Sequence, residues 1–126
     1  MRPLVAVVIP TFSQTIEQRI SLGISEAFAS AEFDVLYAPV GYIPKPHQWH
    51  DSALQPHRDI IALNPSLVIF YSGGLTYKTS PELAKKVLDE YKGIQCIHMG
   101  LKIEGAPSVL VDNYQGMKDL INKMKP

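Results

Sequence analysis

The sequence predicts an α/β fold: a doubly wound, five-stranded parallel sheet with strand order 2-1-3-4-5 and a helix layer on each face. Two observations predict it. Short, continuous apolar runs recur along the chain, and segments with apolar residues at three- and four-residue spacing alternate with them. A continuous apolar run indicates a strand covered on both faces, which is typical of parallel sheets. Right-handed crossovers then favour this strand order.

The predicted strands are rich in Val, Ile and Tyr, and they cover Val5–Ile9, Val35–Val40, Leu67–Tyr71, Ile94–Met99 and Val109–Val111. The first predicted helix carries an apolar stripe from Ile16 to Phe28, with Ser13 or Thr15 as its N-cap.

A further helix begins at Ser80-Pro81-Glu82, because proline suits the first turn, and it stops at Gly93. Residues 41–64 contain prolines that interrupt any long helix, so we expect a loop to about Trp49 and then a short or kinked helix. Asn113 is the expected cap of a last helix, whose apolar face is made by Met117, Leu120, Ile121 and Met124.

The chain of 126 residues has room for one domain, so residues 1–126 are predicted to form a single α/β lobe. Twelve basic and twelve acidic residues give a formal charge of zero, which disfavours direct contact with nucleic acid. No apolar run approaches the roughly 20 residues that cross a bilayer, so no membrane contact is predicted. The single cysteine, Cys96, lies in an expected buried strand and favours a reducing, cytoplasmic location.

Ligands of doubly wound sheets bind beyond the carboxyl ends of the strands. The first such turn, residues 9–14, holds neither the glycine fingerprint of a dinucleotide site nor a P-loop lysine, and it has no glycine for a flavin phosphate loop. We therefore predict no cofactor. Ser72-Gly73-Gly74 lacks the flanking pattern of a nucleophile elbow and is interpreted as a turn or a close backbone approach, so no catalytic residue is predicted.

The histidines allow two interpretations. His47, His50 and His57 with Asp51 have the composition of a metal site, but they are flanked by prolines and have no second ligand pair. Ordinary exposed histidines are the favoured interpretation, and no metal is predicted. His98 is expected to be a hydrogen-bonded core residue.

Aromatic residues follow several of the expected strands and suit a sugar or a nucleoside; they are Phe12, Tyr42, Trp49, Tyr71 and Tyr77. Phe12 is the candidate for stacking on such a ligand, against the alternative that these aromatics only pack in the core or on the surface.

The two ends of the chain resemble a known family. Val5-Ala6-Val7-Val8-Ile9-Pro10-Thr11-Phe12-Ser13, Leu22–Ala27 and Phe33–Leu36 are similar to the start of the type 1 periplasmic-binding-protein-like domain of lactose- and galactose-type repressors. Residues 108–117 resemble the Val-x-x-Asp-Asn-x-x-Gly stretch with which that family leaves its first lobe. The sequence of residues 104–117 is most similar to sensor modules of signalling proteins, including those with diguanylate cyclase or histidine kinase outputs.

The resemblance implies an effector-sensing lobe, in which a sugar or nucleoside is held between two lobes whose closure is passed to an output domain. The ligand-facing residues that it implies are Thr11, Phe12, Ser13, Ser72 and Gly73. Asp112, Asn113 and Gly116 match the crossover motif.

A complete two-lobe domain is more than twice this length, so the chain resembles half of a receptor. In the family the helix after Asp112-Asn113 belongs to the second lobe, and here its apolar face has lost that partner. We expect the helix either to fold back on its own sheet or to pack against a second copy in a homodimer.

Three functions remain open. The first is a ligand-sensing lobe that binds its small-molecule effector weakly, because half a cleft covers little of a ligand. The second is a dimerisation or interaction module without ligand. The third is an enzyme or flavin binder on a flavodoxin-like sheet, which rests only on Ser72 and the histidines.

Overall fold

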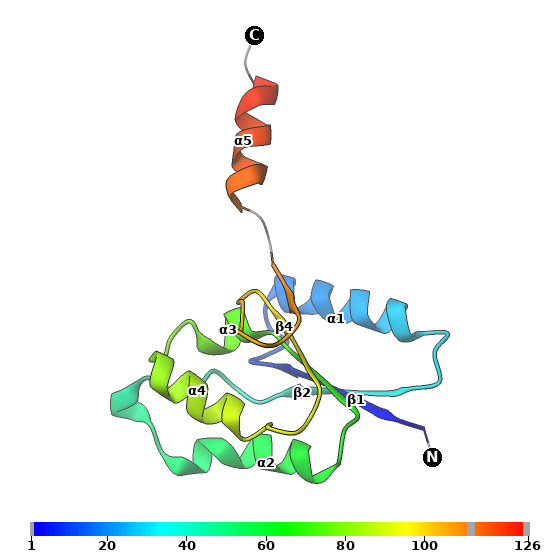
Figure 1. The fold of residues 1–126 in the computed structure, drawn as a ribbon, viewed down its shortest axis with the longest axis vertical. Helices are drawn as coiled ribbons and strands as arrows, with labels where there is room; N and C mark the ends of the chain where they lie inside the picture. The colour runs from blue at the N-terminus through cyan, green and yellow to red at the C-terminus, as the bar shows by residue number, and fades with distance from the viewer. Residues whose placement is uncertain (1, 111–112, 125–126) are drawn as a thin grey trace.

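The computed structural model describes residues 2–110 and 113–124, and it has the predicted α/β fold (Figure 1). Within these residues five parallel strands form one sheet in the order β2-β1-β3-β4-β5, which confirms the predicted topology. The strands are β1 (Leu4–Ile9), β2 (Asp34–Pro39), β3 (Leu67–Phe70), β4 (Cys96–Met99) and β5 (Ser108–Val109). Val111, which closes the last predicted strand, lies outside the described residues.

The helices are α1 (Thr15–Phe28), α2 (Gln55–Ala62), α3 (Ser72–Thr76), α4 (Pro81–Asp89) and α5 (Asn113–Met124), with two 3-10 turns, η1 (Pro46–Gln48) and η2 (Asp51–Leu54). The proline-rich segment between β2 and β3 thus forms a loop, two short turns and one short helix, as expected. The sequence did not predict α3, because its residues Ser72, Gly73 and Gly74 have low helix propensity and were interpreted as a turn.

Each face of the sheet has its own core. Val5, Val7, Ile9 and Ile69 point toward α1, where Ile24 and Phe28 cover them. On the other face Ala6, Val8, Val68 and Phe70 pack with residues of η2, α2 and α4, including Leu54, Ile60 and Val87. Successive residues of β1 and β3 are therefore buried on opposite sides, which explains why these strands read as continuous apolar runs.

The helix starts agree with prediction in one case and differ in the other. At α4 the predicted helix start is confirmed, and the Ser80 hydroxyl caps it by accepting a hydrogen bond from the Leu83 amide at 3.3 Å. At α1 the N-cap residue is Gln14, without a side-chain capping bond, so the prediction of Ser13 or Thr15 was wrong. Thr15 already lies inside the helix, and the Ser13 hydroxyl instead accepts a bond from the hydroxyl of Thr11 at 3.1 Å.

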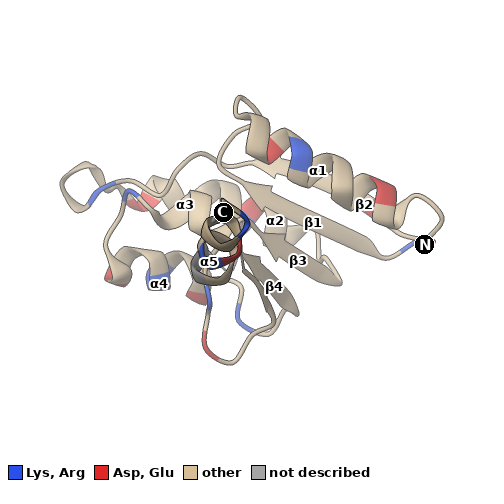
Figure 2. Cartoon of the chain, turned by 90° about the horizontal axis from the view of Figure 1, so that it is seen from above, with Lys and Arg blue, Asp and Glu red and all other residues tan. Residues whose placement is uncertain are grey.

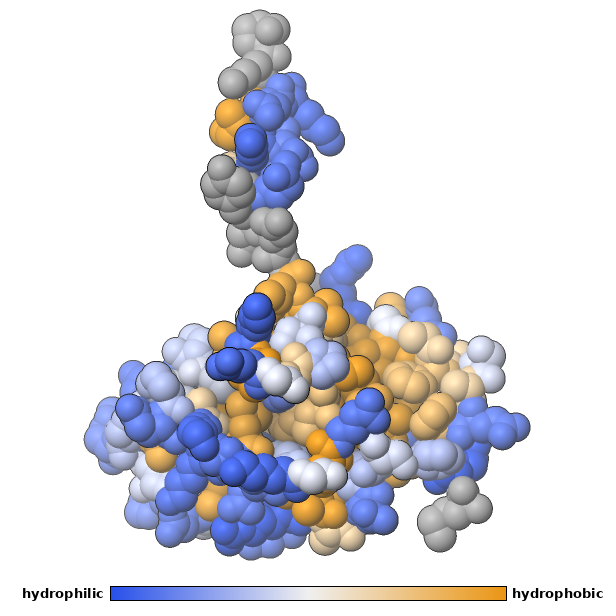
Figure 3. All heavy atoms as spheres, viewed as in Figure 1, coloured by the Kyte–Doolittle hydropathy of each residue, from blue (hydrophilic) through white to orange (hydrophobic). Residues whose placement is uncertain are grey.

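The sheet is less covered at its β4–β5 end. A loop joins these strands, and α5 extends away from the sheet (Figure 1). Figure 3 shows apolar surface around this edge, to which the exposed side chains Leu101, Val109 and Leu110 contribute. Cys96, expected to be buried, is half-buried, because its strand lies beside an edge strand of only two residues.

Candidate functional site

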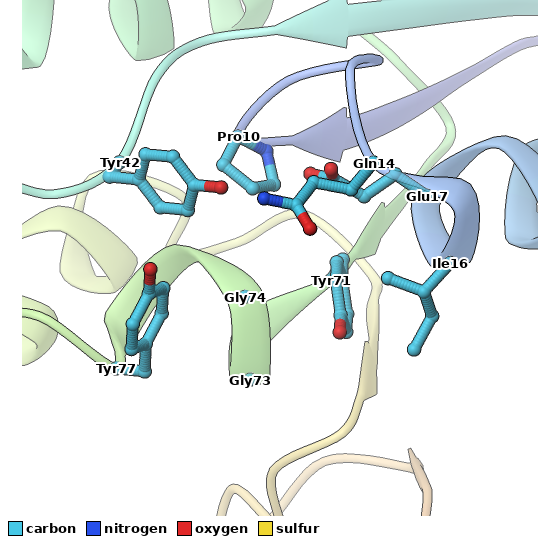
Figure 4. Close-up of a pocket in the computed structure, with 9 residues that line it drawn as sticks. All are labelled: Pro10, Gln14, Ile16, Glu17, Tyr42, Tyr71, Gly73, Gly74 and Tyr77. Carbon is cyan, nitrogen blue, oxygen red and sulfur yellow. The ribbon is translucent and has the colours of Figure 1, made fainter.

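A pocket of about 260 Å³ opens at the carboxyl edge of the sheet, where the loops after β1, β2 and β3 meet (Figure 4). Its lining residues are Pro10, Gln14, Ile16, Glu17, Tyr42, Tyr71, Gly73, Gly74 and Tyr77. This is the place where open parallel sheets bind ligands, because the strand ends leave a crevice between divergent loops. We therefore take it as the candidate site.

Glu17 is the charged residue of the pocket lining. It lies in the first turn of α1 on the side that faces the sheet, and only 1% of its surface is exposed. Its Oε2 accepts a hydrogen bond from the Thr11 amide at 3.2 Å, whereas its Oε1 is buried and has no hydrogen-bond partner among the described residues. Glu17 is not among the residues predicted from the sequence, although its position one turn before the half-buried Ile20 and Ser21 on the inward side of α1 indicates burial.

Tyrosines form the walls of the pocket. The rings of Tyr42 and Tyr77 meet edge to face with centroids 5.6 Å apart, and Lys78 Nζ lies 4.4 Å from the centre of the Tyr42 ring. Tyr71 stands across the opening from them, with the Gln14 side chain between (Figure 4). Burial and then the negative charge of Glu17 raise the pKa of Tyr71. The pocket thus combines aromatic faces, phenol hydroxyls and one acidic group.

Of the ligand-facing residues implied by the resemblance, the first group lies beside the pocket rather than in its lining. Thr11 is half-buried, while Phe12 and Ser13 are exposed. The Ser13 amide donates to Thr11 Oγ1 at 3.0 Å, and the Phe12 carbonyl accepts from Gln18 Nε2 at 2.9 Å. The loop is therefore fixed locally, and Phe12, which is 39% exposed, packs its ring edge to face on Tyr37 with the ring centroids 6.1 Å apart.

The second group, Ser72 and Gly73, includes one residue of the pocket lining and one buried residue. Gly73 lines the pocket, whereas Ser72 is fully buried and its hydroxyl lies 2.6 Å from Nδ1 of His98. His98 is itself buried and stacks on Phe70, so it is the hydrogen-bonded core residue that the sequence predicted. A Cβ on Gly73 would lie 2.8 Å from the carbonyl oxygen of Gly100. This glycine therefore permits a close approach of the β4–β5 loop, in line with the interpretation of the sequence.

The remaining sequence-predicted residues are at the C-terminal end. Asp112 lies outside the described residues; Asn113 and Gly116 belong to α5, which begins at Asn113. The predicted apolar face of α5 is exposed in the structure, with exposed fractions from 48% to 73%, at Met117, Leu120, Ile121 and Met124. The helix has therefore not folded back on its own sheet.

The histidine cluster separates in the structure. His47 and His50 are exposed, whereas His57 is buried and its Nδ1 lies 2.7 Å from the Tyr91 hydroxyl. Among the described residues no group of at least three His, Cys, Asp or Glu side chains is arranged to hold a metal ion. Charged residues of both signs are scattered over the helices and loops, rather than gathered by sign (Figure 2). None of the helices in the described part of the chain is long and apolar enough to span a membrane.

Comparison with known proteins gives one informative match. No protein-family model matches the chain, and no curated protein matches it. Among solved structures it is similar to an ABC transporter solute-binding protein from Clostridium phytofermentans with bound β-D-glucose, with 17% identity and a TM-score of 0.54. The match covers 98% of this chain and 38% of the other. The chain thus has the fold of one lobe of a periplasmic-binding-protein-like protein, and it spans well under half of the protein that it matches.

Proposed function

We propose that the chain is a lobe that binds a small molecule, with a sugar-like or nucleoside-like effector as its ligand, and that it is not an enzyme. The observation that carries the proposal is the pocket at the carboxyl edge of the sheet, with its tyrosine walls and buried acidic group. Aromatic faces beside hydroxyl and carboxyl groups suit the alternating apolar and polar surfaces of a sugar. The glucose bound to the structurally similar protein supports the same class of ligand.

The proposed role is that of a sensor. Closure of this lobe and a second lobe on the ligand would be passed to the output of a transcriptional regulator or a cytoplasmic signalling protein. This finer role rests on the resemblance of residues 5–13 and 108–117 to the repressor-type domain. A single lobe covers one side of its ligand, so weak, millimolar binding is expected of the chain by itself.

The proposal is tested by NMR titration of the isotope-labelled chain with D-glucose and, separately, with adenosine. We expect one of the two to shift the backbone amide signals of the pocket, including those of Gln14, Tyr42 and Gly74. Tyr77→Ala removes an exposed wall of the pocket and should weaken binding. The control Phe33→Ala removes an aromatic ring just before β2, at the amino end of the strands and away from the pocket. It should leave binding unchanged. If neither compound moves the pocket signals, the proposal is wrong.

A second candidate is assembly through α5, which we propose forms a homodimer contact. The observation that favours it is the exposed apolar face of that helix, since leaving such side chains in water forfeits about 1.5–3 kcal/mol each. Leu120→Lys with Ile121→Lys should then lower the solution mass, measured by light scattering, to that of a monomer. Lys118→Ala on the same helix should leave the mass unchanged. A wild-type chain that is already monomeric refutes this candidate.

A further inference from the structure

The buried carboxyl of Glu17 is short of hydrogen-bond donors. A carboxylate offers about four acceptor positions, yet the described partner of this one is the single Thr11 amide at 3.2 Å. Its second oxygen is buried and has no partner in the described part of the chain. Because an unsatisfied buried polar atom is costly, such an atom at a pocket wall indicates that a donor belongs there.

The pocket geometry lets a ligand supply that donor. Figure 4 shows the Glu17 side chain reaching from α1 toward Pro10, with the Gln14 side chain lying in front of it and extending toward the hydroxyl of Tyr42. Gln14 is exposed and makes no capping bond at the start of the helix, so its side chain is free to turn outward. Turning it outward would open the Glu17 carboxyl to a molecule in the pocket.

The surroundings favour a positively charged donor. Among the described residues that line the pocket, Glu17 is the one that carries a charge, and the others are neutral. Two of the tyrosine rings already attract an ammonium group, because Lys78 Nζ lies 4.4 Å from the ring centre of Tyr42 and 5.3 Å from that of Tyr77. Lys78 itself is not a lining residue, and among the described residues it forms no ion pair with Glu17.

From these observations we infer that the pocket selects a ligand carrying a protonated amine, such as an amino sugar, and that Glu17 is the residue that recognises the amine. This inference rests on the proposed function, since it assigns the ligand class of the same pocket. An ammonium group brings three donors, which fits an acidic side chain with an unused oxygen better than a single hydroxyl does.

The test compares D-glucosamine with D-glucose, which differ by one amino group, in NMR titrations of the wild-type chain near pH 6.5. We expect glucosamine to bind about tenfold more tightly, the size of one charge-assisted hydrogen bond. Glu17→Gln keeps the shape and removes the charge, so it should abolish this preference. Glu26→Gln makes the same change at an exposed position of α1 and should keep the preference. Ser21→Ala removes the hydroxyl oxygen that, like Glu17 Oε1, is buried without a partner among the described residues, and it should also keep the preference for glucosamine.

The outcomes separate the two proposals. If glucose binds at the pocket as tightly as glucosamine, this inference is overturned while the sugar-binding function stands. If glucosamine is preferred and Glu17→Gln retains the preference, another group recognises the amine and the assignment of Glu17 is wrong. If Glu17→Gln does not fold, the preference of the wild-type chain for glucosamine over glucose decides the ligand class. Glu17→Asp, which moves the carboxyl away from the pocket, should then reduce that preference. If neither sugar moves the pocket signals, the inference fails.

Discussion

The buried His57 gives the chain a specific dependence on pH. His57 lies on α2, where its ring packs edge to face on Tyr91 and its Nδ1 is 2.7 Å from the Tyr91 hydroxyl. Burial lowers the pKa of His57 to about 4, and the negative charge of Glu90 opposes this only in part. In the unfolded chain the ring has its ordinary pKa near 6.5. The unfolded state therefore binds a proton in a range where the folded state does not.

The sign and the magnitude follow from this difference. Stability contributed by the neutral ring is fully present above pH 6.5 and is lost as the pH falls from 6.5 toward 4. For a folded pKa of about 4, the free energy of unfolding should fall by about 1.4 kcal/mol between pH 7.5 and 5.5, and by about 2.5 kcal/mol by pH 4.5. His98, whose pKa burial also lowers, adds a loss in the same direction.

Urea unfolding followed by circular dichroism at pH 7.5, 5.5 and 4.5 measures these losses. His57→Asn removes the titrating ring and keeps an amide close to the position of Nδ1, so it isolates the contribution of His57 from those of His98 and the carboxylates. The variant should be less stable at neutral pH, and the gap to the wild type should shrink by about 2.5 kcal/mol at pH 4.5. Parallel curves for the two proteins would refute the reasoning, because the ring would then titrate equally in both states.

Two backbone predictions follow from the packing. Gly73→Ala should destabilise the chain by about 1–3 kcal/mol in urea unfolding, because its Cβ meets the Gly100 carbonyl at 2.8 Å. Gly23→Ala, at a helix position with no atom within 4 Å of the new Cβ, should instead stabilise by about 0.5–1 kcal/mol, and equal effects would contradict the steric argument. Ser80→Ala should cost about 1 kcal/mol in the same assay by removing the cap on the Leu83 amide, and an unchanged urea midpoint would show that the cap contributes nothing.

The sequence predicted the fold more completely than the site. Strands that are buried on both faces appear in the sequence as continuous apolar runs. Because parallel connections allow few topologies, the strand order could be predicted from these runs. The short helix α3 was not, because Ser72, Gly73 and Gly74 have turn chemistry, and their helical conformation depends on tertiary packing against Tyr71 and Gly100.

The sequence predicted the edge of the sheet at which the candidate pocket opens, but of the five residues it named as ligand-facing, Gly73 is the one in the described lining. Tyr42, Tyr71 and Tyr77 were all noted as aromatics near strand ends, and all three line the pocket. Glu17 was missed because an acidic residue in the first turn of a helix is ordinarily a solvated partner of the helix dipole. Its position one turn before Ile20 indicates the inward side of α1, but the hydrogen bond from the Thr11 amide depends on the course of the β1–α1 loop, which the sequence does not predict.

The central place of β1 bears on how the chain is made. This strand pairs with β2 on one side and with β3 on the other, and both neighbours follow it in the sequence. At a translation rate of roughly 5–20 residues per second, several seconds separate the synthesis of Ile9 from that of Phe70. During that interval the most apolar strand of the chain has at most one neighbour. The apolar faces of β1 therefore stay incompletely covered until the third strand has been synthesised.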